Sequence, residues 1–185
     1  MGYWLAIVGG YLLGCSNMAF YLEKLTKKSI RGGGSGNLGA SNTVTRLGWL
    51  AGVTVGIHDI GKALLAVYLT QWLWPELTYA PAIAGVACVL GHIFPIFANF
   101  RGGKGVATVL GAVTGIQPNI ALLCFAVWFA SLMLWHYVSL ASIIAGCAFP
   151  VFVSIFSSSI YVRHGLDHTS ISFLVFSFVV AIALV

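Results

Sequence analysis

Long apolar runs separated by short polar stretches make up nearly the whole chain. A helix needs about 20 predominantly apolar residues to cross the hydrocarbon core of a bilayer. Runs of roughly this kind predict an all-α integral membrane protein with about seven transmembrane helices. In chain order they cover residues 3–22, 47–74, 80–100, 106–116, 120–135, 138–160 and 170–185.

The fourth of these runs is short for a full span. Residues 106–116 end at Gln117, Pro118 and Asn119, which predict a turn. A half-membrane helix is acceptable only where its end is buried in protein or faces water. We therefore expect this segment to pack inside the protein.

Composition agrees with a membrane protein, since 59% of the 185 residues are hydrophobic and 7% are charged, with a mean hydropathy of +0.98. A soluble domain of this size would need a more charged surface. We expect one polytopic domain over residues 1–185. The basic residues form no long solvated patch, so nucleic acid is not an expected partner.

The distribution of cations predicts the orientation, because cytoplasmic loops carry an excess of Lys and Arg. Arg163 is placed on the outer side and Lys62 lies within a span. The N-terminus is then outside, the C-terminus is cytoplasmic, and both glycine-rich segments share the cytoplasmic face. The cations on that face are Lys24, Lys27, Lys28, Arg31, Arg46, Arg101 and Lys104.

The segment 91–108, GHIFPIFANFRGGKGVAT, combines two cations with three glycines at the start of an apolar helix. Glycines let successive backbone N–H groups converge on an anion, and a helix N-terminus favours negative charge. Alternatively, the cations are interfacial anchors around a plain turn. The candidate anion-binding residues are Arg101, Gly102, Gly103, Lys104 and Gly105.

The segment 32–46, GGGSGNLGASNTVTR, is a second polar loop rich in glycine and small side chains. Its hydroxyl and amide groups suit phosphate oxygens, and Arg46 offers a two-pronged contact with phosphate. A flexible linker is the alternative. The candidate substrate-binding residues are Ser35, Gly36, Asn37, Gly39, Ser41, Asn42 and Arg46.

Ionisable residues within the spans are the remaining candidates. Asp59 and Lys62 are three residues apart on one helical face, which favours a structural ion pair over direct catalysis. His92 is a candidate for proton transfer if the chain breaks near Pro95, although a histidine hydrogen-bonded between helices is an equal alternative.

Other catalytic patterns are missing. The chain has no GxSxG motif, no His followed five residues later by Asp, and only two aspartates. No residue spacing suggests a metal site, and no cofactor is expected.

Taken together, GSGNLGASN and GHIFPIFANFRGGKGVAT resemble two motifs of the PlsY family, bacterial membrane acyltransferases. The resemblance implies acyl transfer from acyl-phosphate to the 1-hydroxyl of glycerol-3-phosphate, giving lysophosphatidic acid and phosphate in phospholipid synthesis at the bacterial plasma membrane. It implies no need for acyl-CoA or acyl carrier protein. The implied partners are acyl-phosphate, glycerol-3-phosphate and the lipid bilayer. The oligomeric state stays open, and a monomer is consistent with the resemblance.

The resemblance also assigns residues. Ser35, Gly36, Asn37 and Lys104 match a phosphate pocket, and Ser139 and Ser142 match a short serine-bearing segment that completes the substrate-binding set. The candidate catalytic residues are His92, Lys104 and Ser35. The hydroxyl proton is expected to leave through His92, water or the substrate's own phosphate.

The chain departs from the family pattern at several points. It has Ser41 in place of a usual Thr, and its arginine stands at Arg46, one residue after the position matched by Thr45. The family's third motif, a basic segment after the last span, has no counterpart before Val185. These departures leave two alternatives, a truncated chain or a catalytically impaired paralogue. A third alternative is a transporter or binding protein for a small phosphorylated anion, which would use the same cationic, glycine-rich site without chemistry.

Overall fold

The computed structural model describes the backbone of residues 1–164 and the side chains up to residue 156. Every secondary-structure element in this part is helical, so the all-α prediction is confirmed. Five helical segments of this part are long and apolar enough to cross a membrane, and α6 is shorter. The expected span at 170–185 lies outside the described residues.

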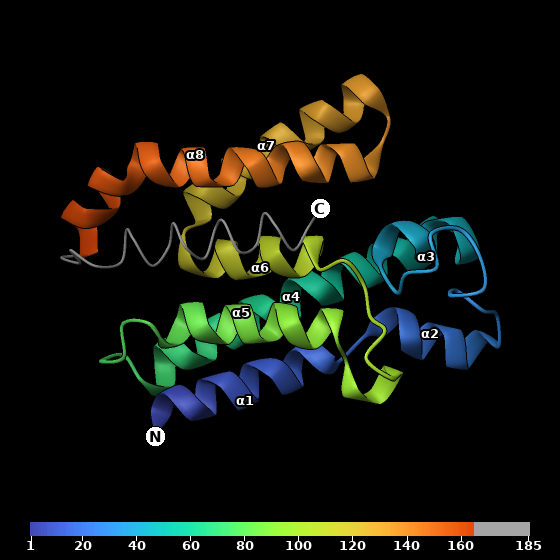
Figure 1. The fold of residues 1–185 in the computed structure, drawn as a ribbon, viewed down its shortest axis with the longest axis horizontal. Helices are drawn as coiled ribbons and strands as arrows, with labels where there is room; N and C mark the ends of the chain where they lie inside the picture. Colours follow the sequence, from blue (N-terminus) through green and yellow to red (C-terminus); the bar gives the residue numbers. More distant parts are fainter. Residues whose placement is uncertain (165–185) are drawn as a thin grey trace. The chain divides into compact units, whose positions relative to one another are not determined.

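The chain divides into two compact units, of which the first covers Met1–Ile116. The second begins at Gln117 and contains α7 and α8 in its described part. Each unit is described by itself, and one domain over residues 1–185 stays a prediction. The first unit contains α1 (Gly2–Cys15), α2 (Met18–Thr26), α3 (Ala40–Leu47), α4 (Trp49–Leu73), α5 (Ala80–Ile93), the 3-10 turn η1 (Ile96–Ala98) and α6 (Val106–Ile116) (Figure 1).

The first apolar run is broken in the structure, because α1 ends at Cys15 and α2 begins at Met18. Asn17 starts α2 by accepting a 3.0 Å hydrogen bond from the backbone N–H of Phe20 through its side-chain oxygen. An amide at this position satisfies one of the free N–H groups at the helix start. The break leaves the carbonyl groups at the end of α1 available to other partners.

The second polar segment is only partly a loop. The expected loop up to Arg46 is wrong in its second half, because α3 begins at Ala40. Gly39 is extended (φ −134°), and its carbonyl accepts hydrogen bonds from the backbone N–H and the hydroxyl of Thr43. These contacts start a helix in a stretch whose composition is typical of a linker.

Small residues bring α1 and α5 into close contact. A Cβ at Gly10 would meet the carbonyl oxygen of Ala84, and one at Gly14 would overlap the carbonyl oxygen of Cys88. Small residues at such spacings let membrane helices approach through their backbones. The buried core between α1, α4, α5 and α6 is correspondingly rich in alanine: Ala6, Ala63, Ala66, Ala80, Ala84 and Ala112.

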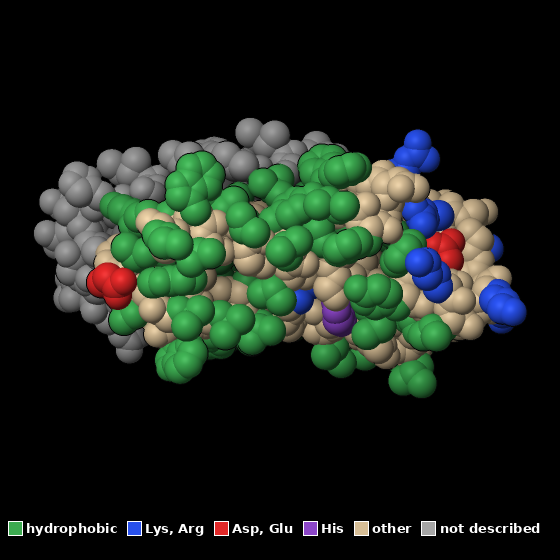
Figure 2. Space-filling model, turned by 90° about the horizontal axis from the view of Figure 1, so that it is seen from below, with side chains coloured by type: hydrophobic (Ala, Val, Ile, Leu, Met, Phe, Trp, Pro, Cys, Tyr) green, Lys and Arg blue, Asp and Glu red, His purple; other side chains and the backbone are tan. Residues whose placement is uncertain are grey.

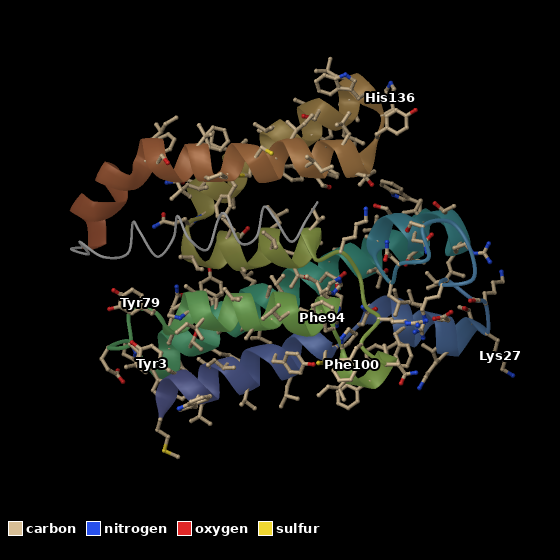
Figure 3. All side chains as sticks on the ribbon, in the orientation of Figure 1. Tyr3, Lys27, Tyr79, Phe94, Phe100 and His136 are labelled. Atoms are coloured by element: carbon tan, nitrogen blue, oxygen red, sulfur yellow. The ribbon has the colours of Figure 1, made fainter. Side chains whose placement is uncertain are left out.

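The two ends of the first unit differ. α2, α3, η1 and the chain leading into α6 gather at one end (Figure 1). The start of α1 and the α4–α5 connection lie at the other, where Figure 3 shows Tyr3 and Tyr79. The face in Figure 2 is largely hydrophobic, with most of its Lys and Arg side chains gathered at one end.

The second unit is a helical pair in its described part. α7 (Pro118–Trp135) and α8 (Val138–His164) pack against each other after a turn at His136, which has a left-handed φ of 60°. Phe125 stacks on Trp128 with a ring-centroid distance of 5.9 Å. This stacking adds an aromatic contact within α7.

We expect Gly14→Ala to destabilise the first unit, because the added methyl group would overlap the backbone of Cys88. Overpacking of this kind costs roughly 1–3 kcal/mol. Thermal unfolding in detergent measures the loss. Gly9→Ala is the matched control on the same helix, because a Cβ there meets nothing within 4 Å; equal stability of the two variants would contradict the packing.

Candidate active site

The two glycine-rich segments lie side by side in the first unit. The backbone N–H of Leu38 donates a 3.3 Å hydrogen bond to the carbonyl of Gly102. The Leu38 carbonyl in turn accepts one from the side-chain amide of Asn17, also at 3.3 Å. Leu38 is fully buried in a cluster with Ile30 and Ala98. The first loop is thus joined to the second loop by the Leu38–Gly102 backbone hydrogen bond and by the packing of Leu38 with Ala98, and to the α1–α2 break by Asn17.

His92 reaches the second loop because α5 ends one residue later. The chain turns at Pro95 and reverses through left-handed conformations at Asn99 and Phe100 (φ 54° and 57°). On its return, the N–H of Gly103 donates to the carbonyl of His92 at 3.3 Å. The break expected near Pro95 is therefore present, and it places His92 beside Gly103.

Glycine is needed where the returning chain meets α5. A Cβ at Gly102 would overlap the carbonyl oxygen of His92, and a Cβ at Gly103 would overlap Nε2 of the His92 ring. Gly105 has a left-handed φ of 85°, which glycine adopts without strain, and α6 starts at the next residue. The three glycines thus allow the loop to lie directly against α5 and then enter α6.

Asn42 braces the first loop from within. Its side-chain nitrogen donates to the carbonyls of Ile30 (2.9 Å) and Asn37 (3.0 Å), and its oxygen accepts from the N–H of Ser35 at 3.1 Å. Both of its N–H donors are therefore used by the loop itself. These hydrogen bonds give Asn42 a structural role, and its binding of substrate stays a prediction.

The other candidate substrate-binding residues of the first segment lie around Asn42. Ser35, Gly36 and Ser41 are exposed, and Asn37 and Gly39 are half-buried. Arg46, on α3, turns its guanidinium toward the loop backbone, where Nε donates to the carbonyl of Ser29 at 3.1 Å.

Arg101 and Lys104 are exposed, and neither forms an ion pair in the described part of the chain. The two Lys/Arg–carboxylate pairs recorded there join Arg31 to Glu23 and Lys62 to Asp59. Lys104 therefore stands, without a protein carboxylate, two residues before the N-terminus of α6. Positive charge at a helix start is the arrangement that attracts a phosphate.

A buried ionic cluster lies on the other side of His92. Lys62 Nζ is 2.9 Å from Asp59 Oδ1, so the pair expected from their spacing is present. The same Nζ is 2.8 Å from Nδ1 of His92, and Asp59, Lys62 and His92 are 2%, 6% and 2% exposed. The spacing of residues along the sequence does not connect this pair with His92. The feature of the sequence that points to this cluster is the presence of fixed charges within an apolar span.

Ser139 and Ser142 belong to the second unit and are not part of the geometry described above. Ser139 is exposed, whereas Ser142 is buried, donating to the carbonyl of Val138 at 2.8 Å and accepting from Nε1 of Trp128 at 3.2 Å. Their proposed contact with substrate stays a prediction. Among the described residues no group of three or more His, Cys, Asp or Glu is arranged to hold a metal ion.

A family model described as "Glycerol-3-phosphate acyltransferase" matches residues 4–185. The chain belongs to this family. The expected resemblance, to PlsY-type glycerol-3-phosphate acyltransferases, is confirmed. A glycerol-3-phosphate acyltransferase of Geotalea daltonii is 42% identical over 150 residues, which are 80% of this chain and 76% of that protein.

Further relatives support the same assignment. Glycerol-3-phosphate acyltransferase 2 of Bacillus anthracis is 40% identical over 163 residues, covering 88% of this chain and 85% of that protein. A crystal structure of PlsY (YgiH), an integral membrane glycerol 3-phosphate acyltransferase in its glycerol 3-phosphate form, superposes with a TM-score of 0.85 at 32% identity. That match covers 100% of this chain and 86% of the PlsY chain.

We expect Gly103→Ala to impair the site, because its methyl group would displace either the His92 ring or the first loop at the Leu38 carbonyl. A displacement of about 1 Å near reacting groups costs roughly a hundredfold in rate. Glycerol-3-phosphate acyltransferase activity at matched amounts of folded protein measures the effect. Gly61→Ala on α4, where a Cβ meets nothing within 4 Å, is the control, and parity between the variants would contradict this geometry.

Proposed function

We propose that this acyltransferase takes its acyl chain from acyl-phosphate and transfers it to the 1-hydroxyl of glycerol-3-phosphate. The observation that carries the proposal is the joining of the two polar segments at one end of the first unit, beside Arg101 and Lys104. Both proposed substrates carry a phosphate that needs positive charge. The glycerol 3-phosphate and lysophosphatidic acid forms of the related PlsY structures support this acceptor and product.

The chemistry balances without a cofactor. The glycerol hydroxyl oxygen bonds to the acyl carbonyl carbon, the bond from that carbon to the phosphate oxygen breaks, and phosphate leaves. The hydroxyl proton can be taken up by the departing phosphate, so the products are the ester and inorganic phosphate. Because acyl-phosphate is already activated, neither a covalent acyl-enzyme nor acyl-CoA is needed.

The cations and the first loop have distinct roles in this proposal. Lys104 and Arg101, in the loop that leads into α6, stabilise the negative charge that develops on the leaving phosphate. Ser35, with the backbone N–H groups of Gly36 and Asn37, holds phosphate oxygens from the first loop. Arg46 can contribute its remaining guanidinium donors only by turning from the loop backbone that it now contacts.

Lys104→Ala should lower the rate of lysophosphatidic acid formation roughly a hundredfold, as expected for removal of one charge-stabilising group. The assay combines purified protein with acyl-phosphate and labelled glycerol-3-phosphate. Lys28→Ala removes a cation at the same end of the unit, outside the two motifs, and should leave the rate nearly unchanged.

The same assay separates the alternatives. Substrate binding without any product, in protein that is folded, would favour a binding protein, a transporter or an impaired paralogue over the proposed enzyme. Product formed from acyl-CoA and not from acyl-phosphate would overturn the proposed donor.

We also propose that the cation-rich end of the first unit faces the cytoplasm of a bacterial cell, with the N-terminus outside. The positive-inside bias supports this orientation. In a variant lacking the exposed Cys147, Lys28→Cys should react with a membrane-impermeant maleimide only after permeabilisation. Thr78→Cys, in the exposed α4–α5 connection, should react in intact spheroplasts. The reverse pattern would refute the orientation.

A further inference from the structure

The His92 ring lies between two different environments in the first unit. Its Nδ1 atom faces the buried ion pair, 2.8 Å from Lys62 Nζ and 3.3 Å from Asp59 Oδ1. Its Nε2 atom lies beside Gly103, at the point where a Cβ would collide with it. The ring therefore connects the ionic cluster to the loop that carries Lys104.

Lys62 is held from several sides. Its Nζ donates to the carbonyls of Gly14 (3.1 Å) and Ser16 (2.7 Å), which lie where α1 ends. Its third hydrogen-bond partner is Nδ1 of His92, whereas Asp59 Oδ1, 2.9 Å away, is an ionic contact without a hydrogen bond. An ammonium group has three protons and no lone pair. With two of these protons donated to the carbonyls, the third is donated to His92, and Nδ1 accepts it.

The state of the His92 ring follows from this contact. A nitrogen that accepts a hydrogen bond carries no proton, so the proton of the neutral ring resides on Nε2. A proton on Nδ1 would instead point toward Asp59 and face the ammonium of Lys62 at 2.8 Å. The carboxylate of Asp59 lies 2.9 Å from the Lys62 ammonium and balances its charge, since an unpaired ammonium in this buried position would be strongly disfavoured.

We infer that Lys62 is a positioning residue that holds His92 in the neutral form with Nε2–H directed at the Gly103 loop. This inference rests on the proposed function. His92 then offers a fixed hydrogen-bond donor to an anion at this loop and does not act as the general base.

The ring state can be measured directly. In protein labelled with ¹⁵N-histidine, the His92 signals, identified by their loss in His92→Gln or by removing the other histidines one at a time, should show a neutral ring protonated on Nε2. A ring protonated on Nδ1, or a charged ring, would overturn the inference. This readout needs no catalytic activity, so it stays informative even if no acyl transfer is found.

The variant Asp59→Asn/Lys62→Met tests the role of the pair without leaving a buried unpaired charge. It should lower kcat/KM about tenfold to a hundredfold and release the fixed ring state of His92, giving a mixture of both neutral forms. A purely structural role would change thermal stability and leave the ring state and kcat/KM of the folded fraction as they were. That result would contradict a positioning role.

A second pair of variants distinguishes a donor from a base. The side-chain amide of Gln in His92→Gln can replace the Nε2–H group, whereas that of Asn in His92→Asn lies closer to the position of Nδ1. The Gln variant should therefore keep about tenfold more activity than the Asn variant. Equal, near-complete losses would indicate that the ring acts as a base, because neither amide can accept the hydroxyl proton.

Discussion

The buried ammonium of Lys62 connects the membrane helices of the first unit with its polar end. From α4 it reaches the carbonyls at the end of α1, the carboxylate of Asp59 and the ring of His92 on α5. A cation in an apolar interior is tolerated only when such partners surround it. The break after α1 supplies two of them, because a continuous helix would have used those carbonyls itself. The irregularity at Ser16 and Asn17 is thus part of how the charge is stabilised.

Close backbone packing then fixes the position of the loops relative to the helices. α1 approaches α5 through Gly10 and Gly14, and the chain after Pro95 returns onto α5 through Gly102 and Gly103. Both contacts exclude a Cβ for the same reason, since backbone carbonyls or the His92 ring already occupy the space. The position of the cation-bearing loop is therefore set by the helix pair, and not by the loop sequence alone.

Much of this was accessible from the sequence, where hydropathy predicts the spans and glycine–cation clusters mark the two polar segments. The spacing of Asp59 and Lys62 also predicts their pairing. The contact between Lys62 and His92 was not predictable, because these residues are 30 positions apart and meet only when α4 and α5 pack. The helix α3 was missed because its small polar residues are equally typical of a linker. The internal role of Asn42 likewise depends on how the loop closes around it.

The cations of the first unit thus fall into two kinds. The three protons of Lys62 are donated to the carbonyls of Gly14 and Ser16 and to Nδ1 of His92, so an additional ligand would gain no hydrogen bond from it. Arg101 and Lys104 have no carboxylate partner within the described residues, and both are exposed in the loop that leads into α6. Two exposed cations without a carboxylate partner favour an incoming anion. A phosphate would therefore supply the negative charge that the protein does not place beside these two cations, whereas a neutral ligand would not.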